Sequence, residues 1–151
     1  MPYRGKAFKF GDNISTDHIA PGRLFHLRSD LQEFAKHVLE DADENFAKNM
    51  NKGDFVVAGN NFGLGSSREH APQIIKIAGV GAVIAKSFAR IFYRNAINIG
   101  LLAIECDTDG IDAGDELDLD IKAGTLKNLT KGTITAIEPL PDVMIKLLRD
   151  G

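Results

Sequence analysis

The sequence predicts an α/β fold with a central, mostly parallel sheet, flanking helices and a smaller antiparallel β portion. Three observations support this prediction. The chain has 151 residues, 44% of them hydrophobic, which suits one packed core and a single domain over residues 1–151. Strand-like and helix-like segments alternate between residues 54 and 106. Beyond Cys106 the pattern changes to a period of two between glycine-bearing turns.

The N-terminal third contains a strand pattern in "KAFKF" (6–10) and an amphipathic helix pattern in "DLQEFAKHVLEDA" (30–42). The segment between them, residues 11–29, is long for a connection and rich in polar groups. Connections of that length without obvious structure often carry function. Residues 11–29 therefore form a candidate functional loop.

The middle of the chain reads as three buried strands, "DFVVAG" (54–59), "VGAVIA" (80–85) and "LLAIEC" (101–106), separated by two helices. The first helix has apolar residues at i, i+3, i+4 and i+7 through residues 71–78 and is closed by a glycine. The second helix covers residues 89–100. This alternation favours parallel strands joined by right-handed crossovers.

The last third predicts antiparallel strands and a final helix. "DELDLDI" (115–121) and "GTITAIE" (132–138) alternate in period two, as expected of strands with one face toward solvent. A helix is expected after Pro141, through "DVMIKLLRD" (142–150).

Charge and cysteine content exclude several classes of function. The 18 basic and 21 acidic residues leave a net charge of -3 without a run of like charges, which disfavours a nucleic-acid partner. Because Cys106 is the sole cysteine, the chain cannot form an internal disulfide or hold an iron–sulfur cluster with four thiolates of its own. No apolar run suggests a signal peptide or a membrane span. We expect a cytoplasmic protein without a membrane partner.

The segment "GNNFGLGSSREHAP" (59–72) concentrates glycines beside hydrogen-bonding groups. It does not fit the dinucleotide motif GxGxxG or the hydrolase motif GxSxG, because Arg68 stands where the last glycine is needed, and it lacks the Gly-Lys-Ser/Thr of a P-loop. Gly63 and Gly65 permit positive φ, and the amides from Gly65 to Arg68 precede a helix, which is typical of an anion site.

A purely structural interpretation of the same segment is capping of the helix. Ser66 and Glu69 have the spacing of a capping box, with Arg68 as a solvated residue of the first turn. Pro72 complicates this interpretation, since it would fall past the first turn, and favours a helix that starts near His70. Spacing alone leaves capping and anion binding both open.

Three elements, "GDNISTDHIAPGR" (11–23), the segment 59–72 and "GVGAVIAKSFARIFYRNAINIGLLAIE" (79–105), together resemble the small subunit of the isopropylmalate isomerase, homoaconitase and aconitase superfamily. The resemblance covers essentially the whole chain. It implies a swivelling β/β/α domain that closes over a large subunit carrying a 4Fe-4S cluster, in a hetero-oligomer such as a heterotetramer. The chain itself is then expected to bind no cofactor.

The resemblance also implies a hydro-lyase that removes water from a hydroxy di- or tricarboxylic acid and adds it back, as in leucine-type or lysine-type biosynthesis. The cluster of the large subunit would act as Lewis acid. Ser66 occupies the position of the catalytic base, and its hydroxyl needs neighbouring positive potential, which Arg68 and the loop amides can supply. Ser67, Arg68 and Gly65 match positions that hold a substrate carboxylate.

The same resemblance places Thr16 and Asp17 at the active-site entrance, with Thr16 toward the substrate and Asp17 orienting a histidine of the large subunit. From the residues alone, Asp17 fits an Asx-turn or a helix cap equally well. His18 is expected to be turn structure or a supporting residue, and His70 a structural histidine on the helix.

Arg28 is the candidate for substrate choice. Isopropylmalate members of the family resemble each other in having an aliphatic side chain near residues 27–28, whereas Arg28 suits a further carboxylate. This favours a tricarboxylate such as homocitrate or homoaconitate, or relaxed specificity; an Arg28 turned to solvent or to Asp30, and a methylated malate as substrate, stay open. Two other classes stay open as well: a regulatory anion-binding module and a phosphate or nucleotide binder.

Overall fold

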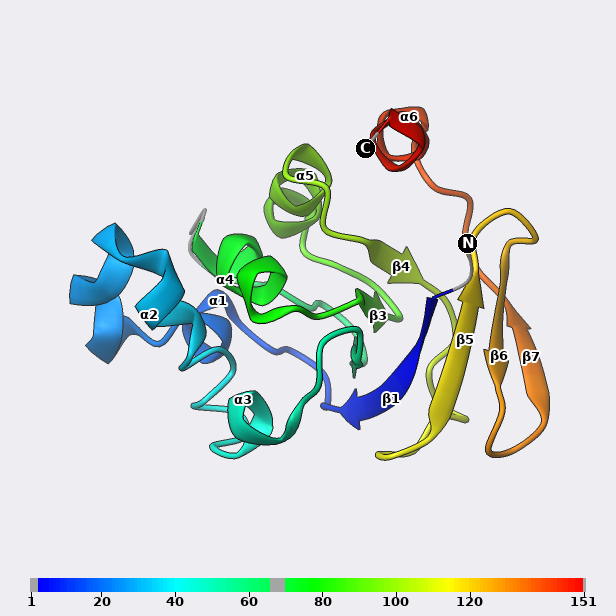
Figure 1. The fold of residues 1–151 in the computed structure, drawn as a ribbon, viewed down its shortest axis with the longest axis horizontal. Coiled ribbons are helices and arrows are strands. Elements are labelled where there is room, and N and C mark those ends of the chain that lie inside the picture. Colours follow the sequence, from blue (N-terminus) through cyan, green and yellow to red (C-terminus); the bar gives the residue numbers. More distant parts are fainter. Residues whose placement is uncertain (1–2, 66–69, 151) are drawn as a thin grey trace.

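The computed structural model describes residues 3–65 and 70–150, with side chains to residue 146, and it has the chain folded around one curled, seven-stranded mixed sheet (Figure 1). The sheet order is β4-β3-β2-β1-β5-β6-β7. The strands are β1 (Tyr3–Lys9), β2 (Phe55–Val57), β3 (Ala82–Ala85), β4 (Ala103–Glu105), β5 (Glu116–Asp120), β6 (Thr125–Asn128) and β7 (Thr133–Ala136). The predicted α/β class is confirmed.

The sheet has a parallel half and an antiparallel half that meet at β1. Strand β1 pairs in parallel with β2, which continues in parallel through β3 to β4. On its other side β1 pairs with β5 in antiparallel fashion, and β6 and β7 extend this half as a meander. Strand β6 was not predicted from the sequence, because "TLKN" is short and is flanked by residues typical of turns.

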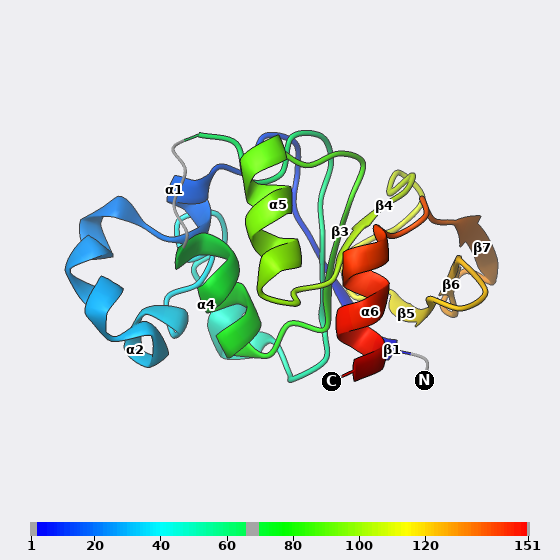
Figure 2. The ribbon, with the colours of Figure 1, turned by 90° about the horizontal axis from the view of Figure 1, so that it is seen from above.

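The helices differ in length between the two ends of the chain. The helices are α1 (Thr16–Ile19), the 3₁₀ helix η1 (Gly22–Ser29), α2 (Leu31–Ala35), α3 (Phe46–Asn49), α4 (His70–Ala78), α5 (Arg90–Asn98) and α6 (Asp142–Asp150), and the α-helices before β2 are shorter than those after it. Helices α4 and α5 lie side by side along the parallel half, and α6 continues the row toward the antiparallel half (Figure 2). No helix in the described ranges is both long and apolar enough to cross a bilayer.

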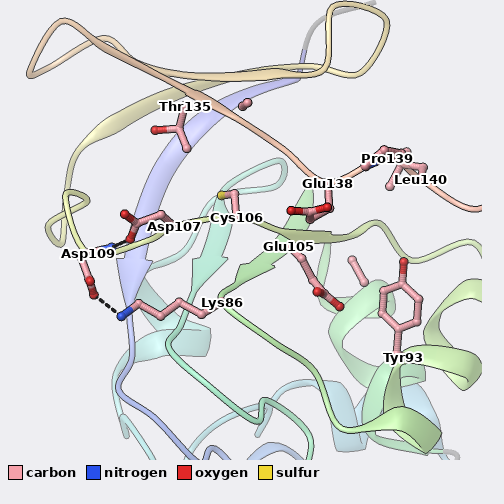
Figure 3. Close-up of a pocket in the computed structure, with 12 residues that line it drawn as sticks. Lys86, Tyr93, Glu105, Cys106, Asp107, Asp109, Thr135, Glu138, Pro139 and Leu140 are labelled. Atoms are coloured by element: carbon pink, nitrogen blue, oxygen red, sulfur yellow. Dashed lines mark hydrogen bonds and ion pairs between the residues drawn. The ribbon is translucent and has the colours of Figure 1, made fainter.

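The two outer strands of the sheet approach each other at one point. The Glu138 N–H donates to the Glu105 carbonyl over 2.9 Å, so the segment after β7 touches β4 and the sheet curls toward closure. A cavity of about 660 Å³ lies beside this contact. Figure 3 shows its acidic lining and the ion pair between Lys86 and Asp109.

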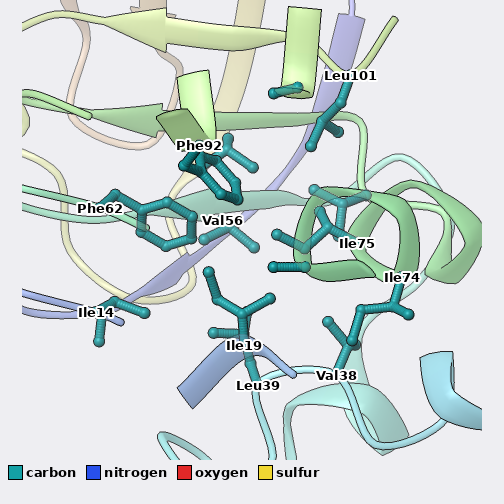
Figure 4. Close-up of a cluster of buried hydrophobic side chains, with 14 of the residues drawn as sticks. Ile14, Ile19, Val38, Leu39, Val56, Phe62, Ile74, Ile75, Phe92 and Leu101 are labelled. Atoms are coloured by element: carbon teal, nitrogen blue, oxygen red, sulfur yellow. The ribbon is translucent and has the colours of Figure 1, made fainter. Parts of the chain in front are cut away.

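The core lies on both faces of the parallel half. All of β2 is buried, and its side chains alternate: Val56 packs toward α4 and α5, while Phe55 and Val57 belong to a second cluster on the other face. Figure 4 shows the first cluster, in which Phe62, from the segment after β2, meets Phe92 of α5. Burial on both faces explains why these strands read as continuous apolar runs.

The structure corrects the predicted helix over residues 30–42. Helix α2 covers Leu31–Ala35 only, and a series of turns follows it. Leu39 has a φ of 58°, and its N–H bonds the Ile19 carbonyl over 3.0 Å instead of continuing a helix. Leu39 is still fully buried, so the apolar periodicity reported burial correctly although the backbone is not helical. The segment 11–29, expected as a loop, contains α1 and η1.

The contact between β4 and the segment after β7 predicts a pH-dependent stability. Burial, and then the charge of Glu138, raises the pKa of Glu105 above its ordinary value of 4.5. The unfolded chain therefore ionises Glu105 at a lower pH than the folded chain, and ionisation costs stability as pH rises through the folded pKa. We expect Glu105→Gln to raise Tm at about pH 7.5 and to lose this advantage near pH 4.

The measurement is thermal unfolding of both proteins across this pH range, with Glu44→Gln as a control at an exposed glutamate outside the sheet. A difference in Tm that does not vary with pH would contradict the burial of Glu105 as its cause.

Candidate functional site

Three segments meet at the edge of the sheet where the parallel strands end. Residues 11–16 follow β1, residues 59–65 follow β2, and residues 86–89 follow β3. Parallel strands present their carboxyl ends at the same edge, and this edge is where open α/β sheets bind ligands. The polar loop 11–29 and the glycine-serine segment, which are far apart in sequence, therefore share one location.

Residues 11–16 and 59–65 are joined along their length by backbone hydrogen bonds. The donor and acceptor pairs are Gly59 N to Gly11 O (3.2 Å), Asn13 N to Asn60 O (2.8 Å), Gly63 N to Ile14 O (2.6 Å) and Thr16 N to Leu64 O (2.8 Å). The Asp12 carboxylate adds a bond from the Asn60 N–H at 2.7 Å. This pairing holds Thr16 beside Gly65.

The third segment supports this pair of loops from the side of β3. The Asn61 N–H donates to Ser87 Oγ over 2.9 Å, and the Phe62 N–H donates to the Ser87 carbonyl over 3.1 Å. The fully buried Phe62 ring contacts the rings of Phe88 and Phe92 edge-on, with centroid distances of 6.0 and 5.3 Å. The "KSFARI" element thus acts as a rigid aromatic support beneath the glycine segment.

Gly63 and Gly65 both have the positive φ that the sequence predicts, at 88° and 106°. A Cβ at Gly63 would lie 2.3 Å from Cγ of Phe92, so only glycine fits between the loop and α5. A Cβ at Gly65 would lie 3.4 Å from Oγ1 of Thr16. Gly65 therefore lets the chain pass closely over the Thr16 hydroxyl.

Thr16 begins the short helix α1 and is 3% exposed. Ser15 caps the helix: its Oγ accepts from the His18 N–H over 3.2 Å, and His18 Nδ1 accepts from the Ser15 N–H over 2.9 Å. His18 is therefore turn structure, as one of the two expectations from the sequence had it. The capping box orients Thr16 inward and Asp17 outward.

Asp17 is exposed, and its Oδ1 accepts from the Gly22 N–H at 3.1 Å. This bond ties α1 to the first residue of η1. Because the bond spans five residues and Ser15 is the N-cap of α1, it is neither the Asx-turn nor the helix cap that the residue type alone suggested. The catalytic role of Asp17 implied by the family resemblance stays a prediction.

Arg28 lies on η1 and is exposed. Its guanidinium carbon is 4.7 Å from the centroid of the Phe25 ring, and its Nη1 donates to the Phe25 carbonyl over 3.1 Å. It does not turn to Asp30, whose Oδ1 instead accepts from the Glu33 N–H and caps α2. The Phe25 ring in turn meets the ring of His70 edge-on at 5.8 Å.

Ser66, Ser67 and Arg68 lie outside the described residues, so their predicted roles are not tested by geometry. Their flanking residues are placed. Gly65 lies over Thr16, and His70, the first described residue of α4, contacts the ring that carries Arg28.

The cavity between β4 and the segment after β7 contains none of the predicted site residues. It is lined by the carboxylates of Glu105, Asp107, Asp109 and Glu138 and by Lys86. Burial, and then the charge of Asp107, raises the pKa of the Cys106 thiol to about 11, so this thiol is protonated near neutral pH and is a poor nucleophile.

Within residues 3–65 and 70–150, no three His, Cys, Asp or Glu side chains are grouped to hold a metal ion. Together with a single, buried cysteine, this means that the described residues do not fit an iron–sulfur cluster.

Comparisons with known proteins agree on one family. The model of the aconitase C-terminal domain matches residues 12–109. The chain is 63% identical, over all of its length and 92% of the relative, to 3-isopropylmalate dehydratase small subunit 2 of Archaeoglobus fulgidus. It is 53% identical, over 98% of its length and 86% of the relative, to the methanogen homoaconitase small subunit of Methanothermobacter thermautotrophicus.

A solved structure supports the same relationship. The crystal structure of a 3-isopropylmalate dehydratase from Methanocaldococcus jannaschii superposes with a TM-score of 0.95 at 45% identity, over 100% of this chain and 90% of that one. The described residues therefore have the same fold as that solved 3-isopropylmalate dehydratase.

The contact between Gly63 and Phe92 predicts a large cost for a single methyl group. Gly63→Ala adds a Cβ at a φ of 88° and 2.3 Å from the Phe92 ring. We expect a loss in the free energy of unfolding of more than about 2 kcal/mol, measured by urea denaturation. Gly114 has the same φ of 88° but nothing within 4 Å of an added Cβ, so Gly114→Ala serves as a matched control.

The control carries the backbone strain alone and should lose only about 1 kcal/mol. Equal losses in the two variants would show that Phe92 yields to the added methyl group.

Proposed function

The chain belongs to the aconitase C-terminal domain family, and from this membership we propose that it is the small subunit of a two-chain hydro-lyase. The enzyme removes water from a hydroxy di- or tricarboxylic acid of the 3-isopropylmalate or homocitrate type and adds it back. The similarity to a 3-isopropylmalate dehydratase small subunit and to a homoaconitase small subunit supports this proposal. The observation that carries it is the pairing of residues 11–16 with 59–65, which brings the two polar motifs together.

The first step proposed for this chain is the removal of a proton from the substrate. Ser66 Oγ, as an alkoxide, takes the proton from the carbon next to a substrate carboxylate, and the electron pair of that C–H bond forms the carbon–carbon double bond. The hydroxyl group leaves the adjacent carbon as hydroxide with the electron pair of the C–O bond, and the Lewis-acidic cluster of the large subunit would accept it. Because a serine hydroxyl is weakly acidic, its alkoxide needs nearby positive potential, for which Arg68 and the backbone amides after Gly65 are the candidates.

Binding of the substrate is assigned to the same corner. Ser67, Arg68 and the amide of Gly65 hold one carboxylate, for which the planar guanidinium fork of Arg68 is suited because both oxygens can be bonded at once. The buried Thr16 lies against Gly65, which supports its assignment to the same binding site. Asp17, the exposed second residue of α1, orients a side chain of the partner.

The partner in this proposal is a large subunit that carries a 4Fe-4S cluster, with both chains in the cytoplasm as a hetero-oligomer. Membership of the aconitase C-terminal domain family supports the assignment of the cluster to that second chain. Leucine-type or lysine-type amino-acid biosynthesis is the proposed context.

Arg28 is proposed to select the substrate. Its guanidinium is exposed near the start of α4, and an alkyl group placed there would gain nothing from the charge. A further carboxylate would form a charge-assisted hydrogen bond. We therefore propose a tricarboxylate of the homocitrate type as the preferred substrate.

The first test concerns the base. The isolated chain should show no hydratase activity, and activity should appear after anaerobic mixing with the large subunit. We expect Ser66→Ala to lower kcat of the pair by about 10³-fold or more while Tm stays unchanged. Thr133→Ala, which removes an exposed hydroxyl on β7, is the control and should keep full activity. Turnover that survives Ser66→Ala would refute Ser66 as the base.

The second test concerns Arg28. With the reconstituted pair, Arg28→Val should reduce kcat/KM for homocitrate by about 10- to 100-fold, the worth of one charge-assisted bond, and leave kcat/KM for 3-isopropylmalate equal or higher. Arg23→Val is a matched control in the same 3₁₀ helix, since Arg23 is held by Glu40 and Asp41. An unchanged ratio between the two substrates in Arg28→Val would exclude Arg28 from substrate choice.

A further inference from the structure

We propose that Phe25 is the positioning residue for Arg28: its ring and its carbonyl hold the guanidinium in place, and the preference for a carboxylate-bearing substrate depends on this support. The inference rests on the proposed function, because it concerns the substrate choice assigned to Arg28.

Two contacts from the same residue fix the guanidinium. The carbon Cζ of Arg28 lies 4.7 Å from the centroid of the Phe25 ring, within the range of a cation–π contact. Nη1 donates to the Phe25 carbonyl at 3.1 Å. The guanidinium has five N–H donors, so the donors other than the one bonded to the Phe25 carbonyl can still bind a carboxylate.

Phe25 is itself held by a second ring. It meets His70 edge-on, with a centroid distance of 5.8 Å and an interplanar angle of 86°. His70 begins the described part of α4, and the next two residues, Ala71 and Pro72, are buried in the core. The sequence of contacts Arg28–Phe25–His70 therefore links an exposed charge to a helix that the core holds rigidly.

This link matters because the other anchors of η1, which are Arg23, the Gly22 N–H and the partly buried Leu24 and Leu27, do not hold the guanidinium of Arg28. None of its eight residues is buried, and Leu24 and Leu27 are only partly covered by the core. Phe25 is 40% exposed, which is a high value for phenylalanine. This exposure is consistent with a residue that supports Arg28 and does not fill the core. Without the ring, Arg28 would keep its charge but sample many rotamers.

The two arginines of η1 show the difference. Arg23 is neutralised by Glu40 at 2.6 Å and Asp41 at 2.8 Å. In the part of the chain that the structure describes, no carboxylate is within ion-pairing distance of Arg28. An aromatic support holds a cation without cancelling its charge, so Arg28 keeps the capacity to bind an anionic group.

The test uses the reconstituted two-chain enzyme and the ratio of kcat/KM for homocitrate to kcat/KM for 3-isopropylmalate. We expect Phe25→Leu to lower this ratio about three- to tenfold through a higher KM for homocitrate, because a loose arginine must be ordered on binding. Phe25→Tyr, which keeps the ring, should retain the wild-type ratio. Phe25→Met repeats the comparison with a second flexible apolar side chain if Phe25→Leu does not assemble with the large subunit.

A double-mutant cycle separates positioning from general damage. In the Arg28→Val background, Phe25→Leu should have no further effect on the ratio, since the side chain that it supports is gone. Leu129→Ala, which truncates a side chain 43% exposed beyond β6, controls for loss of an exposed apolar group. A merely structural role would lower kcat/KM for both substrates equally and leave the ratio unchanged, and that result would overturn the inference.

The two proposals fail in different ways. A wild-type pair that turns over neither acid overturns the proposed function. A wild-type pair that is active, with Phe25→Leu at the wild-type ratio or with an equal loss in the Arg28→Val background, overturns the role of Phe25 alone.

Discussion

The pairing of residues 11–16 with residues 59–65 is the constraint on which the rest of the site depends. It is made of backbone hydrogen bonds, so it fixes the relative position of the two segments irrespective of side-chain rotamers. It exists because β1 and β2 are parallel neighbours, whose carboxyl ends must emerge together. Thr16 and Gly65 are brought into contact by this geometry although 48 residues separate them in the chain.

The floor beneath that pairing is aromatic and tightly packed. Phe62 enters from the glycine segment, Phe88 follows β3, and Phe92 belongs to α5. Gly63 can take its position only because no side chain separates it from Phe92. Closely packed interiors have little free volume. The segment 59–65, whose Phe62 packs against Phe88 and Phe92, therefore has little freedom to move as a whole.

Electrostatic roles are divided between distant parts of the molecule. The cavity beside β4 is acidic, and its buried contacts raise the pKa of Glu105 and of the Cys106 thiol. The corner that holds Thr16, Gly65 and Arg28 instead has a guanidinium supported by an aromatic ring. A carboxylate substrate would be repelled by the first region and attracted by the second. The size of the acidic cavity is therefore no guide to where the substrate binds.

The sequence by itself determined the class of fold, the strands β1 to β5 and β7, the helices α4 to α6 and the positive φ of Gly63 and Gly65, because local periodicity and glycine chemistry report them directly. It also located the polar motifs. It missed β6, overextended α2 and left Arg28 open between a substrate carboxylate and a side chain turned to solvent or to Asp30. Only the tertiary structure showed that Arg28 rests on Phe25 and that Leu39 leaves the helix to bond Ile19. The bond from Leu39 to Ile19 joins two separate segments of the chain. Phe25 and Arg28 are close in sequence, but their contact depends on the 3₁₀ conformation of η1 and on the His70 ring from α4, so no local pattern encodes either outcome.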